Sequence, residues 1–214
     1  MRDPNEVRDL VRRIVDATLA GDGTPAAAAG TGPAATAGTG TATAGTTAAP
    51  TGPTPTREAI AIGGDHGGYR LKDAIGRVLG EAGFAVRDCG TNSPAAVDYP
   101  DIAHAVARLV ADGECRWGII VDGAGIGSCM VANKVPGVRA ALCHDLSSAR
   151  NSREHNHANV LTLGAGFIGE ALAIEIVRAW LGTEWGPGRH AARVEKITDV
   201  ERRYMREPGE GRAG

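Results

Sequence analysis

The chain contains a long internal segment with no side chain that could help to build a hydrophobic core. Residues 24–56 consist only of Ala, Gly, Thr and Pro. Such a composition cannot bury enough apolar surface to offset the entropy lost when the backbone becomes ordered. We therefore predict a disordered linker over residues 22–56. This linker separates residues 1–21 from a folded domain that begins near Arg57.

The residues before the linker have the pattern of an amphipathic helix. Residues 3–20 place apolar side chains at helical spacing and charged side chains on the other faces. The segment lacks the apolar core of a secretory signal, and its acidic residues argue against a mitochondrial presequence. A helix on a flexible tether docks naturally into an apolar groove of another protein. The alternative is packing against its own domain or against its counterpart in an oligomer.

Beyond Arg57, short apolar runs alternate with helical patterns. This alternation predicts βαβ crossovers and an α/β fold of three layers, in which a five-stranded parallel sheet is covered on both faces. Ligands bind such sheets at the carboxyl ends of the strands. We expect strands at 58–62, 84–88, 118–121, 138–143 and 160–163, and helices at 69–81, 100–111, after Ser128, at 146–153, 169–181 and 194–205.

Charge and cysteine content exclude several classes of function. The formal net charge of −2 argues against nucleic acid as the main partner and gives no signal for membrane binding. The four cysteines have neither C-x-x-C nor zinc-like spacing, so we expect reduced thiols in a cytoplasmic protein. No continuous apolar stretch is long enough to span a bilayer.

The segment 117–134 has the pattern of a loop that holds an anion. A strand-like run ends at Asp122, glycines follow at Gly123, Gly125 and Gly127, and a short helix comes next. Glycine lets the backbone approach a ligand closely, and the first N–H groups of a helix lack internal partners. An acid at the mouth of such a loop could move a proton on the bound molecule. The same pattern also describes α/β loops that only pack.

Four further polar clusters fall in loops or at strand ends. Singly, each has a structural explanation as a helix cap, a turn or a solvated helix face. Together they supply histidines, carboxylates and paired arginines, which is the inventory of an enzyme for a phosphorylated substrate. The clusters are Gly64-Asp65-His66-Gly67, Asp98-Tyr99-Pro100-Asp101, Arg153-Glu154-His155-Asn156, and Gly188-Arg189-His190 with Arg193.

These motifs occur in the order and spacing of a known family. Residues 59 to about 197 resemble the ribose-5-phosphate isomerase B group, which includes the galactose-6-phosphate isomerase subunits. The matching segments are AIGGDHGGYRLK, DYPD, DGAGIGSCMVANKVPGVRAALCHD, SAR followed by REHNHANVLTLGA, and GPGRHAARVEKI. The resemblance implies an aldose–ketose isomerase with a Rossmann-like fold and without a metal or cofactor. It also implies a homodimer or homotetramer with sites between subunits. We thus expect the isomerase domain over 57–197, and a helix end and tail over 198–214.

The same resemblance implies roles for individual residues. Asp65 and His66 match the pair that contacts the sugar and assists ring opening, and Tyr99 lies in the segment near the sugar. His155 matches the family's acid, and Asn156 matches a substrate contact. The loop that stabilises the enediolate oxygens matches Gly123, Ala124, Gly125, Ile126 and Gly127, and the phosphate clamp matches Arg189 and Arg193.

The chain departs from the family pattern at several positions. Many members carry a cysteine as the base where this chain has Asp122, and another branch uses a glutamate at the position of Ser128. We predict Asp122 as the base, because one positioned carboxylate can move a proton between adjacent carbons. Cys129 is the rival. Ala124 replaces a common hydroxyl residue, and Gly166 stands where relatives often have a phosphate-contacting arginine.

The leading hypothesis is an isomerase that converts ribose 5-phosphate to ribulose 5-phosphate through a cis-enediolate. The alternative is a catalytically altered domain that binds sugar phosphates or acts as a scaffold. Residues 1–56 resemble the encapsulation peptides that recruit enzymes to bacterial microcompartments, which implies a shell protein as the partner of residues 3–20. A dinucleotide-binding domain fits poorly, because its glycine loop should follow the first strand.

Overall fold

The computed structural model of the chain describes residues 58–204. The helix predicted at 3–20 and the linker predicted at 22–56 lie outside the described residues, as does the end of the predicted tail. Among the residues that are described, no helix is long and apolar enough to cross a membrane.

A five-stranded parallel sheet forms the middle layer, as predicted from the sequence. The strand order is β2-β1-β3-β5-β4. The three central strands are buried almost throughout, which explains why they appear in the sequence as continuous apolar runs. The strands are β1 (Ala59–Gly64), β2 (Ala85–Asp88), β3 (Trp117–Asp122), β4 (Ala140–Leu142) and β5 (Val160–Gly164).

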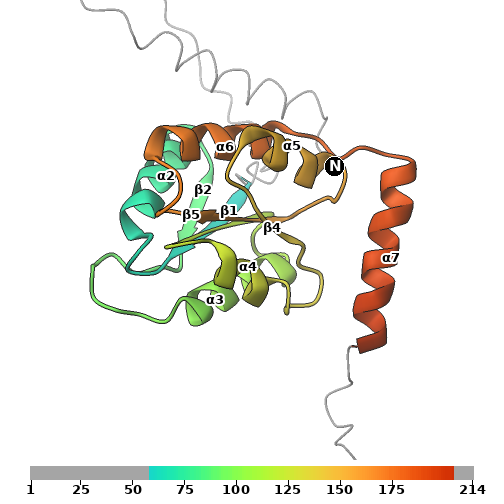
Figure 1. The fold of residues 1–214 in the computed structure, drawn as a ribbon, viewed down its shortest axis with the longest axis horizontal. Coiled ribbons are helices and arrows are strands. Elements are labelled where there is room, and N and C mark those ends of the chain that lie inside the picture. Colours follow the sequence, from blue (N-terminus) through green and yellow to red (C-terminus); the bar gives the residue numbers. More distant parts are fainter. Residues whose placement is uncertain (1–57, 205–214) are drawn as a thin grey trace, which may run out of the picture.

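Helices cover both faces of the sheet and complete the three layers of a Rossmann-like sandwich (Figure 1). On one face lie α2 (Tyr69–Glu81), α5 (Leu146–Glu154) and α6 (Glu170–Gly182), and on the other lie α3 (Tyr99–Ala111) and α4 (Ile126–Ala132). The last helix, α7 (Arg189–Tyr204), stands apart from the sandwich, at the right of the view in Figure 1.

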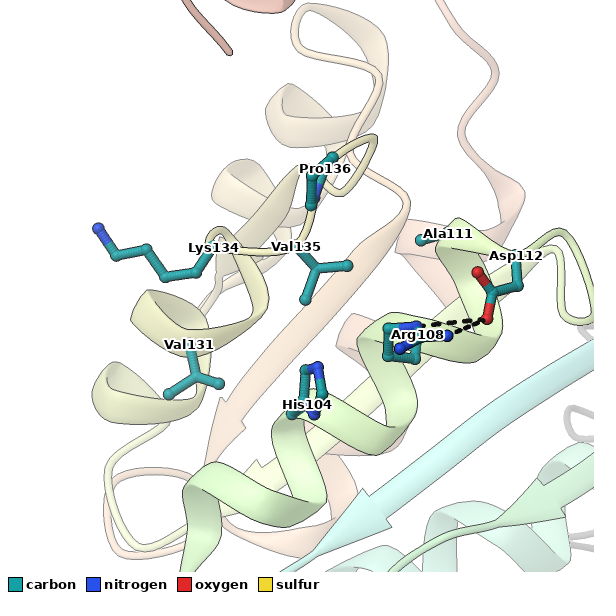
Figure 2. Close-up of a pocket in the computed structure, with 8 residues that line it drawn as sticks. All are labelled: His104, Arg108, Ala111, Asp112, Val131, Lys134, Val135 and Pro136. Carbon is teal, nitrogen blue, oxygen red and sulfur yellow. Dashed lines mark hydrogen bonds and ion pairs between the residues drawn. The ribbon is translucent and has the colours of Figure 1, made fainter. Parts of the chain in front are cut away.

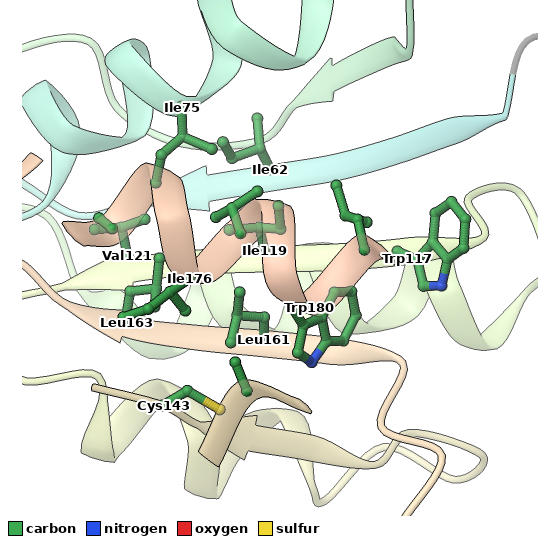
Figure 3. Packing of buried hydrophobic residues seen from close by; sticks show 14 of the residues in the cluster. Ile62, Ile75, Trp117, Ile119, Val121, Cys143, Leu161, Leu163, Ile176 and Trp180 are labelled. Atoms are coloured by element: carbon green, nitrogen blue, oxygen red, sulfur yellow. The ribbon is translucent and has the colours of Figure 1, made fainter. Parts of the chain in front are cut away.

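Two hydrophobic cores hold the layers together. The larger core packs the sheet against α2, α5 and α6 (Figure 3). Ile119 and Leu161 from the central strands meet Ile176 and Trp180 of α6 in this core, and all four are at most 1% exposed. The smaller core packs the other face of the sheet against α3 and α4, with Val106 and Ile120 among its members. Both faces of the sheet are therefore closed to solvent.

Two helices begin earlier than the sequence pattern predicts. Helix α4 starts at Ile126, directly after Gly125, whose φ of 76° is a left-handed conformation that glycine adopts readily. Helix α7 starts at Arg189, five residues before the predicted start. Its first turns contain mostly exposed residues, so the apolar periodicity becomes visible only from Val194 onward.

The strand order has its topological switch point at the carboxyl ends of β1 and β3. From β1 the chain crosses to β2 on one side, and it then returns to β3 on the other side of β1. The connections therefore diverge between β1 and β3, and a doubly wound sheet binds its ligand at this switch point. The loops that carry Asp65 and Asp122 both start here.

Candidate active site

The loop after β1 is closed by the Asp65 side chain. Its Oδ1 atom accepts hydrogen bonds from the backbone N–H groups of Gly67 (2.9 Å) and Gly68 (3.0 Å). Its Oδ2 atom has no donor among residues 58–204. Gly68 presses against the end of β3, since a Cβ atom at this position would lie 2.0 Å from the carbonyl oxygen of Val121. The glycine thus brings the Asp65 loop into direct contact with the strand that ends at Asp122.

The next residue, His66, is exposed but has one hydrogen-bond partner. Its Nδ1 atom accepts from the backbone N–H of Val97, at 3.3 Å. Because a backbone N–H can only donate, Nδ1 is unprotonated in this arrangement, and a neutral ring carries its proton on Nε2. His66 can therefore donate a hydrogen bond from Nε2.

Asp122 is 5% exposed and accepts four hydrogen bonds from its own loop. Oδ1 accepts from the N–H groups of Ala124 (2.8 Å) and Gly125. Oδ2 accepts from the N–H group (3.3 Å) and the hydroxyl group of Ser128. A carboxylate has about four lone-pair sites, so all of them are engaged. The Ser128 hydroxyl is the partner that can leave most easily, because it rotates about one bond.

The remaining N–H groups of this loop are available to a ligand. Within the described part of the chain, the N–H groups of Gly123, Ile126 and Gly127 have no hydrogen-bond acceptor. A Cβ atom at Gly127 would lie 2.5 Å from the ring of Tyr99, so the ring lies directly against this backbone. The structure thus brings Tyr99 to the loop.

Gly164, the last residue of β5, and Gly166, in the connection to α6, pack against the loop after β3. The N–H of Gly166 donates to the carbonyl oxygen of Gly123, at 2.9 Å. A Cβ atom at Gly166 would lie 2.9 Å from that oxygen, and one at Gly164 would lie 2.6 Å from the carbonyl oxygen of Ala124. Gly166, at the position where relatives often carry arginine, therefore makes a close backbone contact with the loop.

The thiol of Cys129 faces away from this loop. It donates to the carbonyl oxygen of Ala140 in β4, at 3.5 Å, and Asn133 lies 3.6 Å from it. Burial raises the pKa of the Cys129 thiol. A thiol with a raised pKa is a weak source of thiolate at neutral pH.

A second cluster contains the other predicted site residues. The ring of His155 stacks on the ring of His190, with centroids 4.3 Å apart and planes inclined by 1°. The side-chain amide of Asn151 lies 2.8 Å from His155 Nδ1. Arg189 and Arg193 are exposed on successive turns of α7, and Asn156 is exposed beside His155. The sequence analysis assigned no role to His190. Its position between Arg189 and Arg193, which match the phosphate clamp, could have marked it as a candidate site residue.

The two clusters lie at opposite ends of the strands, here called the two edges of the sheet. Asp65 and Asp122 stand at the carboxyl ends of their strands, whereas His155 and Asn156 precede the amino end of β5. Five paired positions, Gly118↔Val160 to Asp122↔Gly164, separate the two edges along β3 and β5. At about 3.3 Å per residue, this stretch is roughly 16 Å long. One chain therefore does not bring all the predicted site residues together.

A pocket of about 550 Å³ lies between α3 and the end of α4 and contains none of the predicted site residues (Figure 2). Arg108 and Asp112 pair with each other on its wall, at 3.1 Å, and apolar side chains such as Val131 and Val135 line its floor. Among the described residues, no group of three or more His, Cys, Asp or Glu side chains could hold a metal ion.

Comparison with known proteins identifies the family. The ribose/galactose isomerase family matches residues 60–197. The ribose-5-phosphate isomerase B of Escherichia coli is 47% identical over 144 residues, which cover 67% of this chain and 97% of that protein. The D-erythrulose-4-phosphate isomerase of Pectobacterium atrosepticum is 45% identical over 140 residues, covering 65% and 92%.

Solved structures agree with this result. The ribose-5-phosphate isomerase B of Clostridium thermocellum has a TM-score of 0.68 and 50% identity, and the match covers 69% of this chain and 99% of that one. The Mycoplasma genitalium enzyme, solved with bound ribulose 5-phosphate, has a TM-score of 0.65 and 40% identity, covering 67% and 96%. The chain therefore belongs to the ribose/galactose isomerase family of aldose–ketose isomerases.

Proposed function

We propose that this isomerase interconverts ribose 5-phosphate and ribulose 5-phosphate. The observation that carries the proposal is the loop after β3, where a carboxylate lies beside three unpaired backbone N–H groups. Such groups can stabilise the two oxygens of an enediolate. The names of the E. coli relative and of the solved C. thermocellum structure favour this pentose phosphate.

Asp65 and His66 would open the sugar ring. Asp65 Oδ2 would accept the proton of the anomeric hydroxyl and return it to the ring oxygen as the C1–O4 bond breaks, while His66 Nε2 would donate a hydrogen bond to that oxygen. The free Oδ2 atom and the hydrogen bond from Val97 to Nδ1 support these two roles. The product is the open-chain aldehyde that isomerisation requires.

Asp122 would then move the proton between carbons. Its carboxylate removes the proton from C2, and the C–H electrons form the C1=C2 bond of a cis-enediolate. The proton returns to C1, while O2 loses its proton and O1 gains one, so the atoms balance. Oδ2 becomes free for this step when the Ser128 hydroxyl rotates away. The raised pKa of the Cys129 thiol and its contact with Ala140 favour Asp122 over Cys129.

A second copy of the chain would complete the site. His155 as the acid, Asn156 as a substrate contact, and Arg189 and Arg193 as the phosphate clamp lie at the edge opposite Asp122. A partner that presents this edge would bring them to the substrate, and the fork of each guanidinium suits a phosphate. The exposed apolar stripe of α7 also favours a homodimer or homotetramer. Ile197, Val200 and Tyr204 are 45%, 53% and 82% exposed.

Residues 3–20 would bind a shell protein and place the enzyme in a bacterial microcompartment. The relatives align over nearly their whole length with the folded part of this chain, so its first residues are additional to them. A fluorescent protein fused to residues 1–56 should co-localise with compartment shells. A diffuse signal in cells that contain intact shells would contradict this role.

The activity is tested by measuring ribose 5-phosphate turnover, with a chelator present, for the native chain and for Asp122→Asn. The amide keeps an oxygen for the loop N–H groups but is not a base, so kcat should fall by about 10²–10⁴-fold. Asp122→Cys, which restores the family's residue, should recover part of this loss. Native turnover in Asp122→Asn would exclude Asp122 as the base. No turnover of any aldose phosphate by the native chain would favour the sugar-phosphate-binding alternative.

A further inference from the structure

Lys72 is a buried cation that joins α2 to the connection between β2 and α3. Its side chain is 1% exposed. The Nζ atom lies 2.6 Å from Asp88 Oδ2, 2.6 Å from Asn92 Oδ1 and 3.1 Å from Asp73 Oδ1. The contacts with Asp88 and Asn92 are hydrogen bonds, and the contact with Asp73 is an ion pair. Asp88 is the last residue of β2, and Asn92 belongs to the connection between β2 and α3.

The β2–α3 connection crosses the carboxyl end of β1 directly above Lys72. The N–H group of Thr91 donates to the carbonyl oxygen of Gly64, at 3.0 Å. Between these residues and the lysine there is no space for a side chain. A Cβ atom at Gly90 would lie 2.4 Å from the Gly64 nitrogen and 2.9 Å from Lys72 Cδ. The methylene groups of Lys72 therefore pack directly against this connection at Gly90.

The far end of the same connection contacts His66. Within it, Ser93 and Ala95 donate only to neighbouring side chains, which forms a local turn. The N–H of Val97 then donates to His66 Nδ1. For residues 94–98, this is the one hydrogen bond to another part of the described domain. Val97 thus lies between the anchor at Asp88 and Asn92 and the start of α3 at Tyr99.

We propose that Lys72 is a positioning residue that sets the orientation and tautomer of His66 through this connection. The proposal rests on the ring-opening role proposed for His66. While Lys72 holds Asp88 and Asn92, Val97 directs its N–H at Nδ1 and keeps the His66 proton on Nε2, where the ring oxygen needs it. Without Lys72 the connection loosens, and His66 populates both tautomers and further rotamers.

Two variants remove the anchor and one matched variant preserves it. Lys72→Met deletes the ammonium group and keeps most of the methylene stem. Asn92→Ala deletes a contact on an exposed residue, so the chain keeps its fold even if Lys72→Met does not. The control is Asp73→Asn, which weakens an ion pair of Lys72 within α2 and leaves the contacts with Asp88 and Asn92 unchanged.

The first measurement is the long-range ¹H–¹⁵N spectrum of the histidine rings, with the His66 signals assigned from His66→Gln. The native chain and Asp73→Asn should show a single His66 tautomer with the proton on Nε2. Lys72→Met and Asn92→Ala should show both tautomers. Native His66 signals in both anchor variants would overturn the proposal, whatever their activity. This measurement needs no turnover, so it separates failure of the positioning role from failure of the proposed function.

The second measurement is the steady-state rate with ribose 5-phosphate. Partial loss of the hydrogen bond from His66 Nε2 should lower kcat by about ten-fold in Lys72→Met and Asn92→Ala, with little change in KM. Asp73→Asn should keep the native kcat. An equal loss of kcat in Asp73→Asn would mean that the ion-pair cluster stabilises α2 generally, and would also overturn the proposal.

Discussion

Replacing Gly68 with alanine should push apart the two loops that form the candidate active site. A Cβ atom at this position would lie 2.0 Å from the Val121 carbonyl oxygen and 2.5 Å from its carbonyl carbon, whereas real Cβ atoms stay beyond 3.0 Å. The obstacle is backbone, so no side-chain rotation relieves it. The backbone conformation of Gly68, with φ of −109° and ψ of −9°, is accessible to alanine. The effect is therefore steric.

The size of this clash predicts its consequence for catalysis. The end of β3 and the start of α2 must separate by about 1 Å, and a misplacement of that size can lower the rate by about 10²-fold. Asp122 follows Val121 directly, so the proposed base moves with the strand. Overpacking of this kind also costs about 1–3 kcal/mol of unfolding free energy. Both quantities are measurable, as kcat/KM with ribose 5-phosphate and as the midpoint of denaturant unfolding.

The matched control is Gly76→Ala, the same substitution within α2, the helix that begins directly after Gly68. A Cβ atom at Gly76 would meet nothing within 4 Å. Alanine is favoured over glycine within helices by about 1 kcal/mol, so this variant should be at least as stable as the native chain and equally active. If Gly68→Ala also has native kcat/KM and native stability, the close contact between the two loops does not set the reactive geometry.

Three further results are expected. Cys129→Ser should keep most of the native kcat, because burial raises the pKa of this thiol; a loss comparable to that of Asp122→Asn would make Cys129 the base. Burial, with help from nearby arginines, lowers the pKa of His157 to about 4. Its contribution to stability is therefore present above about pH 6.5 and lost as the pH falls from there towards 4. His157→Asn, which suits the left-handed φ of 51° at this position, should flatten this part of the stability curve, and an unchanged curve would refute the assignment. Deleting residues 189–204 should lower the molecular mass in sedimentation to that of a monomer and abolish turnover, and an oligomer of native stoichiometry would contradict the proposed role of α7.

Local patterns in the sequence were sufficient to predict the sheet and most helices. The central strands are continuous apolar runs because both of their faces are covered, and α2 and α3 show clear apolar stripes. The start of α7 was missed because its first residues are largely exposed. For α4, the boundary depends on the left-handed Gly125, which the sequence shows only as one glycine among several.

The site was only partly predictable, because its decisive contacts join residues that are distant in sequence. Asp122 and the glycines after it form one contiguous motif, and the order of the strands brings the Asp65 loop to them. Lys72 looks like an ordinary polar helix residue, and its role becomes visible only when Asp88 and Asn92 meet it from 16 and 20 residues away. The separation of His155 from Asp122 follows from strand direction and not from any motif.

The placement of the two clusters at opposite edges of the sheet has a genetic consequence. We propose that each active site combines the Asp122 edge of one chain with the Arg189 edge of another. Two chains with defects at different edges would then complement each other when they assemble together. An Asp122→Asn chain and an Arg189→Ala chain, each inactive alone, would form hybrids in which one site receives both intact edges and the other receives both defects. Co-expression of two dead alleles would then restore growth that depends on this isomerase.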